Sequence, residues 1–143
     1  MRKFLCGIVL PFLFLACNSG KKMSSQNSLA SLEGTWQLNY ITGPRIAFDG
    51  LYPDKKPTIT FDLKKNIVSG NTSCNNFSGQ FNVADNKISF TEAMAMTKMA
   101  CPGEGETIFL QALKKVNSYD VTAGYTLALL MDDTAIMRFT KVQ

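Results

Sequence analysis

The sequence predicts a mainly β domain, a small antiparallel β-barrel of about eight strands with one α-helix packed against it. Short segments in which apolar and polar residues alternate recur from residue 32 to the end of the chain, separated by turn residues. This pattern is typical of half-buried antiparallel strands. One segment, 104–116, has its apolar residues at helical spacing instead. Many short strands with tight turns and a single helix favour a sheet that curls into a barrel.

The first 16 residues have the pattern of an export signal. Arg2 and Lys3 precede an apolar run from Phe4 to Ala16, which matches the charged and apolar regions of a secretory signal. The run is too short to cross a bilayer as a helix, which needs about 20 residues. Pro11 also argues against a buried core helix.

The end of the apolar run, Phe14-Leu15-Ala16-Cys17, resembles a bacterial lipoprotein box, although Phe14 stands where leucine is usual. The resemblance implies that Cys17 is lipidated and becomes the mature N-terminus. We therefore assign residues 1–16 to a lipoprotein signal peptide, 17–31 to a flexible tether and 32–143 to the domain. The alternative is secretion without lipidation of Cys17. The expected location is the cell envelope, lipid-anchored to the membrane, in the outer membrane facing the periplasm.

Composition excludes several function classes. The chain has no histidine, which excludes catalytic triads and histidine metal sites. Without residues 1–16 the chain has 13 basic and 11 acidic residues. This net charge is too small to indicate nucleic acid as a partner. Paired carboxylates at Glu104/Glu106 and Asp132/Asp133 are explained by a helix start and a hairpin turn. We expect a protein that is not an enzyme and needs no cofactor.

The first part of the domain is predicted to be a run of strands. The expected strands are 32–41, 57–63, 67–71, 77–83 and 87–90, followed by a short one around Met94 and Met96. In the first strand, alternation places Trp36, Leu38 and Tyr40 on the inner face. Gly70 and Gly79 are expected to mark bulges or bends where the barrel curves.

The second part is predicted to contain the helix and three further strands. Apolar residues at 108, 109, 112, 113 and 116 form one helical face. Glutamates at its start and Lys114 and Lys115 at its end suit the helix dipole. The strands expected after it are 118–122, 125–131 and 135–142.

Four motifs in this order resemble the META domain, the heat-shock HslJ-like family of bacterial lipoproteins. They are Gly34-Thr35-Trp36, the run from Cys74 to Gly79, the run from Met96 to Cys101, and the helix that follows. The resemblance spans residues 32–143. It implies a small antiparallel β-barrel with a packed helix, in proteins linked to heat stress, antibiotic tolerance or virulence, without an established catalytic activity.

Cys74 and Cys101 are the only cysteines after Cys17. In an exported protein, two such cysteines are most simply a disulfide. Closing this span stabilises a fold by roughly 3–4 kcal/mol in the loop-entropy model. The sequence therefore predicts a Cys74–Cys101 disulfide.

Polar residues beside these cysteines form the candidate binding site, composed of Asn75, Asn76, Ser78, Thr97 and Lys98. One interpretation is a hydrogen-bonding recognition site at the barrel mouth. The other, which we favour, is turn chemistry, because Asn and Ser side chains bond to nearby backbone in tight turns. Lys98 is expected to extend to solvent.

Sulfur-bearing side chains are dense in the same region, at Met94, Met96, Met99 and Cys101. Thioether and thiolate ligands select Cu(I), so a copper-handling lipoprotein is the alternative function. The simpler interpretation is that these methionines fill gaps in the core. No metal site is assigned. The favoured hypothesis is a noncatalytic binding module for an envelope protein or a small apolar ligand, acting in stress or antibiotic tolerance.

Overall fold

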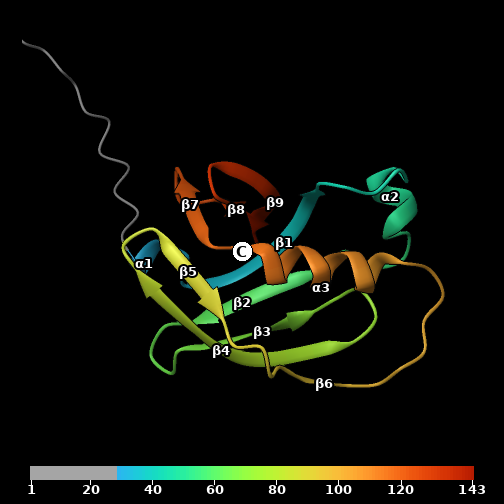
Figure 1. Cartoon of the computed structure of the whole chain (residues 1–143), viewed down its shortest axis with the longest axis horizontal. Helices are drawn as coiled ribbons and strands as arrows, with labels where there is room; N and C mark the ends of the chain where they lie inside the picture. Colours follow the sequence, from blue (N-terminus) through green and yellow to red (C-terminus); the bar gives the residue numbers. More distant parts are fainter. Residues whose placement is uncertain (1–28) are drawn as a thin grey trace, which may run out of the picture.

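The computed structural model describes residues 29–143, and its strands form a closed antiparallel barrel (Figure 1). The strands are β1 (Gly34–Ile41), β2 (Thr58–Asp62), β3 (Ile67–Asn71), β4 (Asn76–Ala84), β5 (Lys87–Phe90), β6 (Ala95–Met96), β7 (Ser118–Thr122), β8 (Thr126–Met131) and β9 (Thr134–Lys141). Eight of them follow one another in the order β3-β2-β1-β9-β8-β7-β5-β4, and β4 pairs back with β3. This closure confirms the predicted fold class. The predicted signal peptide and Cys17 lie outside the described residues.

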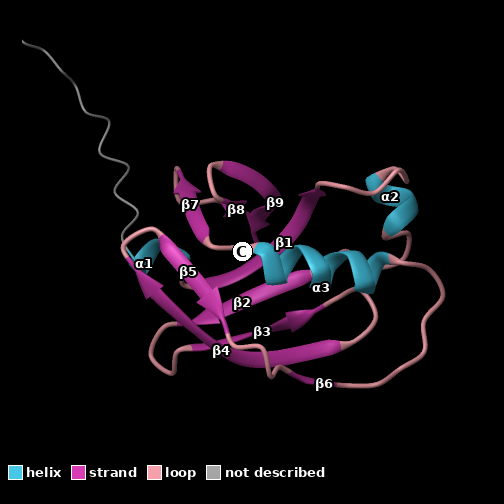
Figure 2. Ribbon diagram, viewed as in Figure 1, coloured by secondary structure: helices cyan, strands magenta, loops and turns pink. Residues whose placement is uncertain are grey.

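Three helices accompany the barrel in the described part of the chain (Figure 2). They are α1 (Leu29–Leu32), α2 (Phe48–Leu51) and α3 (Gly105–Lys115). Residues 29–31, which we assigned to the tether, lie in α1. The indole Nε1 of Trp36 donates to the carbonyl oxygen of Leu32 at 2.9 Å. Across residues 29–143, no helix has the length and apolar character needed to span a membrane.

The ninth strand, β6, lies beside β4 rather than in the barrel order. One edge of β4 pairs with β3 over residues 76–80. Its other edge pairs with β5 at residues 81–84 and with β6 at residues 77 and 78. The strands β5 and β6 therefore follow each other along the same edge of β4. The predicted short strand around Met94 and Met96 is this two-residue β6.

Side chains of the strands fill the barrel interior. Its largest fully buried apolar members are Trp36, Leu38, Ile59, Phe61, Leu127, Leu129, Met137 and Phe139. The rings of Phe61 and Phe81 meet edge to face, with centroids 5.2 Å apart. Burial of such side chains stabilises a domain by roughly 1.5–3 kcal/mol each. The interior is thus a packed core.

The predicted inward position of Tyr40 is wrong. Trp36 and Leu38 are fully buried, but Tyr40 is 40% exposed and Ile41 is buried instead. The register between β1 and β9 shifts between Leu38 and Tyr40. Such a bulge inserts one residue and so reverses the inward and outward alternation beyond it. The ring of Tyr40 lies outside the barrel, 4.9 Å from the guanidinium carbon of Arg138.

Neither Gly70 nor Gly79 lies at a bulge, because β3 and β4 pair in regular register through both residues. Gly70 pairs in regular register with Ile59 on β2 and Phe77 on β4. A Cβ at Gly70 would lie 2.0 Å from the carbonyl oxygen of Thr58. Glycine is needed here because the neighbouring backbone approaches closely, which is the other common reason for glycine inside a strand.

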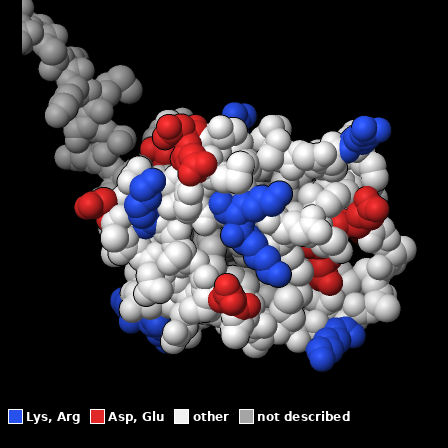
Figure 3. Space-filling model, in the orientation of Figure 1, with Lys and Arg blue, Asp and Glu red and all other residues white. Residues whose placement is uncertain are grey.

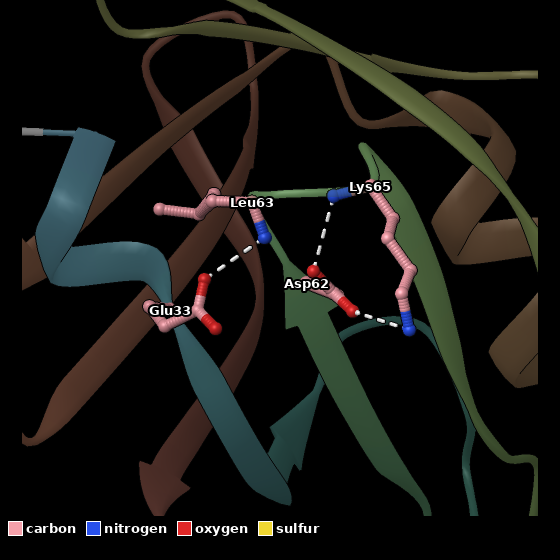
Figure 4. Close-up of polar contacts among 4 residues, drawn as sticks. All are labelled: Glu33, Asp62, Leu63 and Lys65. Carbon is pink, nitrogen blue, oxygen red and sulfur yellow. Dashed lines mark hydrogen bonds and ion pairs between the residues drawn. The ribbon is translucent and has the colours of Figure 1, made fainter.

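The hairpin between β2 and β3 turns at residues 63–66, so the strand ends one residue before the predicted end at Leu63 (Figure 4). The carboxylate of Asp62 accepts from the Lys65 main-chain amide at 3.1 Å and forms an ion pair with its Nζ at 3.5 Å. The hydrogen bond from that amide is the main cause that lowers the pKa of Asp62. Glu33, just before β1, accepts from the Leu63 amide at 2.8 Å. The Glu33 contact joins the turn to the start of the domain, while the Asp62 contacts lie within the hairpin itself.

Candidate functional site

The helix α3 follows the predicted pattern and covers part of the barrel. Its buried residues are Gly105, Phe109, Ala112 and Leu113. The ring of Phe109 packs against Phe77 of β4, with centroids 5.8 Å apart. Tyr52 donates its hydroxyl to the carbonyl oxygen of Gly105 at 3.0 Å. A Cβ at Gly105 would lie 2.7 Å from the Tyr52 ring, so glycine allows the helix start to approach Tyr52.

A disulfide joins Cys74 and Cys101, with their Cα atoms 5.9 Å apart. Cys74 lies two residues before β4, and Cys101 lies in the segment that leads into α3. Cys74 is buried, whereas Cys101 is exposed. The crosslink therefore ties the segment after β6 to the start of β4, and encloses β4, β5 and β6 in one loop.

Asn75 is the centre of a hydrogen-bond network next to this disulfide. Its side chain is buried, and its Nδ2 donates to the carbonyl oxygen of Met99 at 3.1 Å and to Oε1 of Glu106 at 3.0 Å. Its Oδ1 accepts from Thr97 Oγ1 and from the Met99 amide, both at 2.8 Å. Both polar atoms of the amide are therefore satisfied by the protein itself.

Thr72 and Glu106 also belong to this network, although no sequence pattern predicts either as a site residue. Glu106 accepts from the Asn75 amide at 3.1 Å through Oε2, and the Thr72 hydroxyl also donates to that oxygen. Thr72 is fully buried. For Glu106 the sequence predicts only a position at a helix start. No periodicity or motif links Glu106 to Thr72 and Asn75, because Glu106 lies in α3 whereas the other two lie in the loop between β3 and β4.

The other predicted binding residues lie close by but play different parts. Thr97 Oγ1 accepts from the Asn76 amide at 3.0 Å, and Asn76 Oδ1 accepts from Asn71 Nδ2 at 2.9 Å. Ser78 and Lys98 are exposed. Within the described part of the chain, no buried side-chain nitrogen or oxygen lacks a hydrogen-bond partner. The geometry supports the interpretation of Asn75, Asn76 and Thr97 as structural residues.

A concave surface lies between the β5–β6 edge and α3, and we call it the α3 groove. It has a volume of 640 Å³, within the range of about 300–1,000 Å³ usual for ligand sites. It is lined by Ser89, Phe90, Thr91, Glu92, Met94, Met96, Leu110, Leu113, Lys114 and Val116. Six of these side chains are apolar, and Glu92 and Lys114 supply one charge of each sign. Figure 3 shows basic side chains over the C-terminal end of α3, where Lys114 and Lys115 lie.

The methionines divide between two environments. Met94 and Met96 are partly buried and line the α3 groove, while Met99 is 58% exposed and does not line it. Neither Cys74 nor Cys101 is a thiolate while the disulfide is intact. Of the sulfur ligands considered for Cu(I), only the thioethers of Met94 and Met96 therefore lie together at the groove. In residues 29–143 there is no group of three or more His, Cys, Asp or Glu side chains that could hold a metal ion.

A second concave surface lies on the other flank of α3 and has a volume of 480 Å³. It is lined from α3 by Ile108, Gln111 and Lys115, and from the loop after β1 by residues 42–46. Arg45 and Lys115 face it together with Glu104. Its lining is more mixed in charge than that of the α3 groove.

The comparison with protein families decides the identity of the chain, because the META-domain model matches residues 27–143. The protein belongs to the META-domain family. The resemblance seen in the sequence is thereby confirmed. The match begins two residues before α1, so it includes residues 29–31, which we assigned to the tether. None of the curated proteins matches the chain.

Solved structures similar to this META domain support the same fold. An NMR structure of a protein from Burkholderia xenovorans has a TM-score of 0.63 and 23% identity, and covers 100% of this chain and 99% of its own. A second NMR structure has a TM-score of 0.55 and 22% identity, covering 77% and 90% of the two chains. A crystal structure of a DUF4847-family protein from Bacteroides vulgatus has a TM-score of 0.56 and 16% identity, covering 78% and 96%. At these identities the likeness concerns the fold alone.

Proposed function

We propose that this META-domain protein is a noncatalytic binding module of the bacterial cell envelope. In this proposal, acyl chains on Cys17 anchor it to the outer membrane, where it faces the periplasm. Several acyl chains on one residue give stable anchoring, since each buried methylene contributes about 0.8 kcal/mol. Its role lies in tolerance of stress or antibiotics, exerted through a partner that it binds.

The observation that carries the proposal is the position of the apolar surface. The barrel interior is filled by fully buried side chains such as Trp36, Phe61 and Phe139, so a ligand inside the barrel has no room. The α3 groove instead presents apolar side chains on the outside of the domain. Methionines at 94 and 96 suit such a site, because flexible thioether side chains adapt to different apolar partners. The partner is therefore an envelope protein or a small molecule with an apolar surface.

Fluorescence of an anilinonaphthalene sulfonate dye tests the groove. The full chain, with its disulfide intact, is expected to bind the dye, and Leu110→Lys is expected to weaken binding about tenfold by placing a charge in the apolar lining. Gln111→Lys is the matched control, because Gln111 is exposed and lines the other flank of α3. Equal dye binding by the two variants would contradict the assignment of the groove.

The membrane anchor is tested separately by fractionation of cells. The protein is expected in the membrane fraction, with the mass of acyl chains on Cys17. Cys17→Ser is expected to leave that fraction, whereas Cys6→Ser, inside the predicted signal peptide, is expected to remain in it. Native mass spectrometry of the protein purified from its own host then identifies any retained lipid, metal ion or protein partner.

A further inference from the structure

The outer edge of β5 is unpaired where it reaches the α3 groove. Among the described residues, β5 and β7 pair only at Lys87 and Ser118, and the Ile88 amide donates to Asn117 O at 3.2 Å. The amide of Asn117 donates to Leu130 on β8 rather than back to β5. The segment that precedes β7 therefore diverges from β5 at this point. Beyond Ile88, β5 has no neighbouring strand on that side.

The main chain of Phe90 faces this open side. The Ile88 amide and the carbonyl of Asn86 both bond toward β7, while the Thr91 amide donates to Gln80 O on β4 at 3.0 Å. Backbone groups of alternate residues in a strand face the same edge. The N–H and C=O of Phe90 therefore face away from β4, and Phe90 is one of the residues that line the α3 groove. The groove thus offers a backbone donor and acceptor beside its apolar walls.

The walls of the groove suit a chain that lies along β5. Met94 and Met96 lie on the strand side and Leu110 and Leu113 on the helix side. Lys114 adds a positive charge on the helix side and is not within ion-pair distance of an acidic group in residues 29–143. An occupant with an acidic group on its helix-facing side would be complementary to it.

We propose that the α3 groove binds an extended, apolar segment of another polypeptide, which adds as a strand to the open edge of β5 and places an acidic side chain near Lys114. Strand addition of this kind takes affinity from backbone hydrogen bonds and specificity from the pockets that receive alternate side chains. The inference rests on the proposed function and names the class of partner for the same groove.

A capped seven-residue peptide of alternating leucine and threonine with one central aspartate is the probe. Isothermal titration to the full chain is expected to detect binding. Two N-methylated versions carry methyl groups on alternate amides, one on the odd positions and one on the even positions. Because only one set of amides faces β5, one version is expected to bind at least about tenfold more weakly and the other to bind nearly as the parent does.

Two measurements on the protein locate the peptide. Hydrogen exchange of the Phe90 amide is expected to slow when peptide is bound, whereas that of the Ile88 amide, already bonded to Asn117, is expected to change little. Lys114→Glu is expected to weaken binding about two- to fivefold. Lys115→Glu makes the same charge change on the other flank of α3 and is expected to leave binding unchanged.

The outcomes separate the two proposals. Equal loss of binding for both N-methylated peptides, or an unchanged Phe90 amide at saturation, would overturn strand addition while leaving an apolar binding groove. If Leu110→Lys weakens dye binding but the peptide does not bind, strand addition is overturned and the apolar binding groove stands. If neither dye nor peptide binds the groove, both the partner class and the proposed function fail.

Discussion

Asn75 and Glu106 are 31 positions apart in the sequence and are joined by two hydrogen bonds, from the Asn75 amide to Oε2 at 3.1 Å and from its Nδ2 to Oε1 at 3.0 Å. One residue precedes β4 and the other lies in the first turn of α3. The pair therefore fixes the start of the helix against the barrel. It does so next to the disulfide, so that one corner of the domain has both a covalent and a polar link.

Asn75→Asp is expected to lower the free energy of unfolding by more than about 3 kcal/mol. The substitution removes the Nδ2 donor and places a second carboxylate against Glu106 in a buried position. Asn76→Asp is the matched control, since Asn76 is exposed and its Oδ1 only accepts a hydrogen bond, from Asn71. Urea denaturation checks both variants. Similar losses for the two would contradict the special role of Asn75.

Loss of the disulfide is expected to lower the free energy of unfolding by roughly 3–4 kcal/mol, from the entropy of the opened loop. Denaturation of the double variant Cys74→Ala/Cys101→Ala, compared with the oxidised protein, measures this change. A thiol reductant is expected to bring the natural protein to about the stability of the double variant and to leave the variant unaffected. A reductant effect on the double variant would show that the lost stability has another source.

Leu32→Ala is expected to cost about 2–5 kcal/mol of unfolding free energy. Leu32 is fully buried, and its carbonyl oxygen accepts from the Trp36 indole. Leu29→Ala, at the 46% exposed start of α1, is expected to change stability by less than about 0.5 kcal/mol. The fluorescence of Trp36, the single tryptophan of the chain, reports the unfolding transition. Equal effects would mean that α1 is not anchored through Leu32.

Stability is expected to fall at alkaline pH, above about 10. Burial raises the pKa of the Tyr52 hydroxyl above its usual value, so the unfolded chain loses this proton at a lower pH than the folded chain does. The unfolding free energy then decreases as pH rises, by up to about 1.4 kcal/mol per pH unit for one such group.

Tyr52→Phe is expected to make this decline shallower. Some decline is expected to remain, because burial also raises the pKa of Tyr119. Tyr125→Phe, at a residue that is 62% exposed, is the control and is expected to keep the slope of the natural protein. Urea denaturation at a series of alkaline pH values measures all three proteins. An unchanged slope in Tyr52→Phe would contradict the assignment to Tyr52.

Local patterns were sufficient for the strands and for α3, but not for the four-residue helices α1 and α2 or for the bulge in β1. The alternation of Ile59 and Phe61 and the helical spacing of Phe109 and Leu113 predicted the faces that are buried. Tyr40 was placed on the wrong face because the register shift lies in the pairing of β1 with β9. A bulge depends on the partner strand, and a period read along one segment carries no information about that partner.

The sequence by itself determined the fold class, the family and the pair of cysteines, because each depends on residue types and spacing within short segments. Only the tertiary structure decided that Thr72, Asn75 and Glu106 form one network and that Met94, Met96 and Leu110 line one groove. In each set, the residue on α3 is distant in the sequence from the others, which lie in the β3–β4 loop or around β6. Their contacts exist only after the barrel closes and α3 packs on it, since hydrogen bonds and apolar contacts act over a few ångströms.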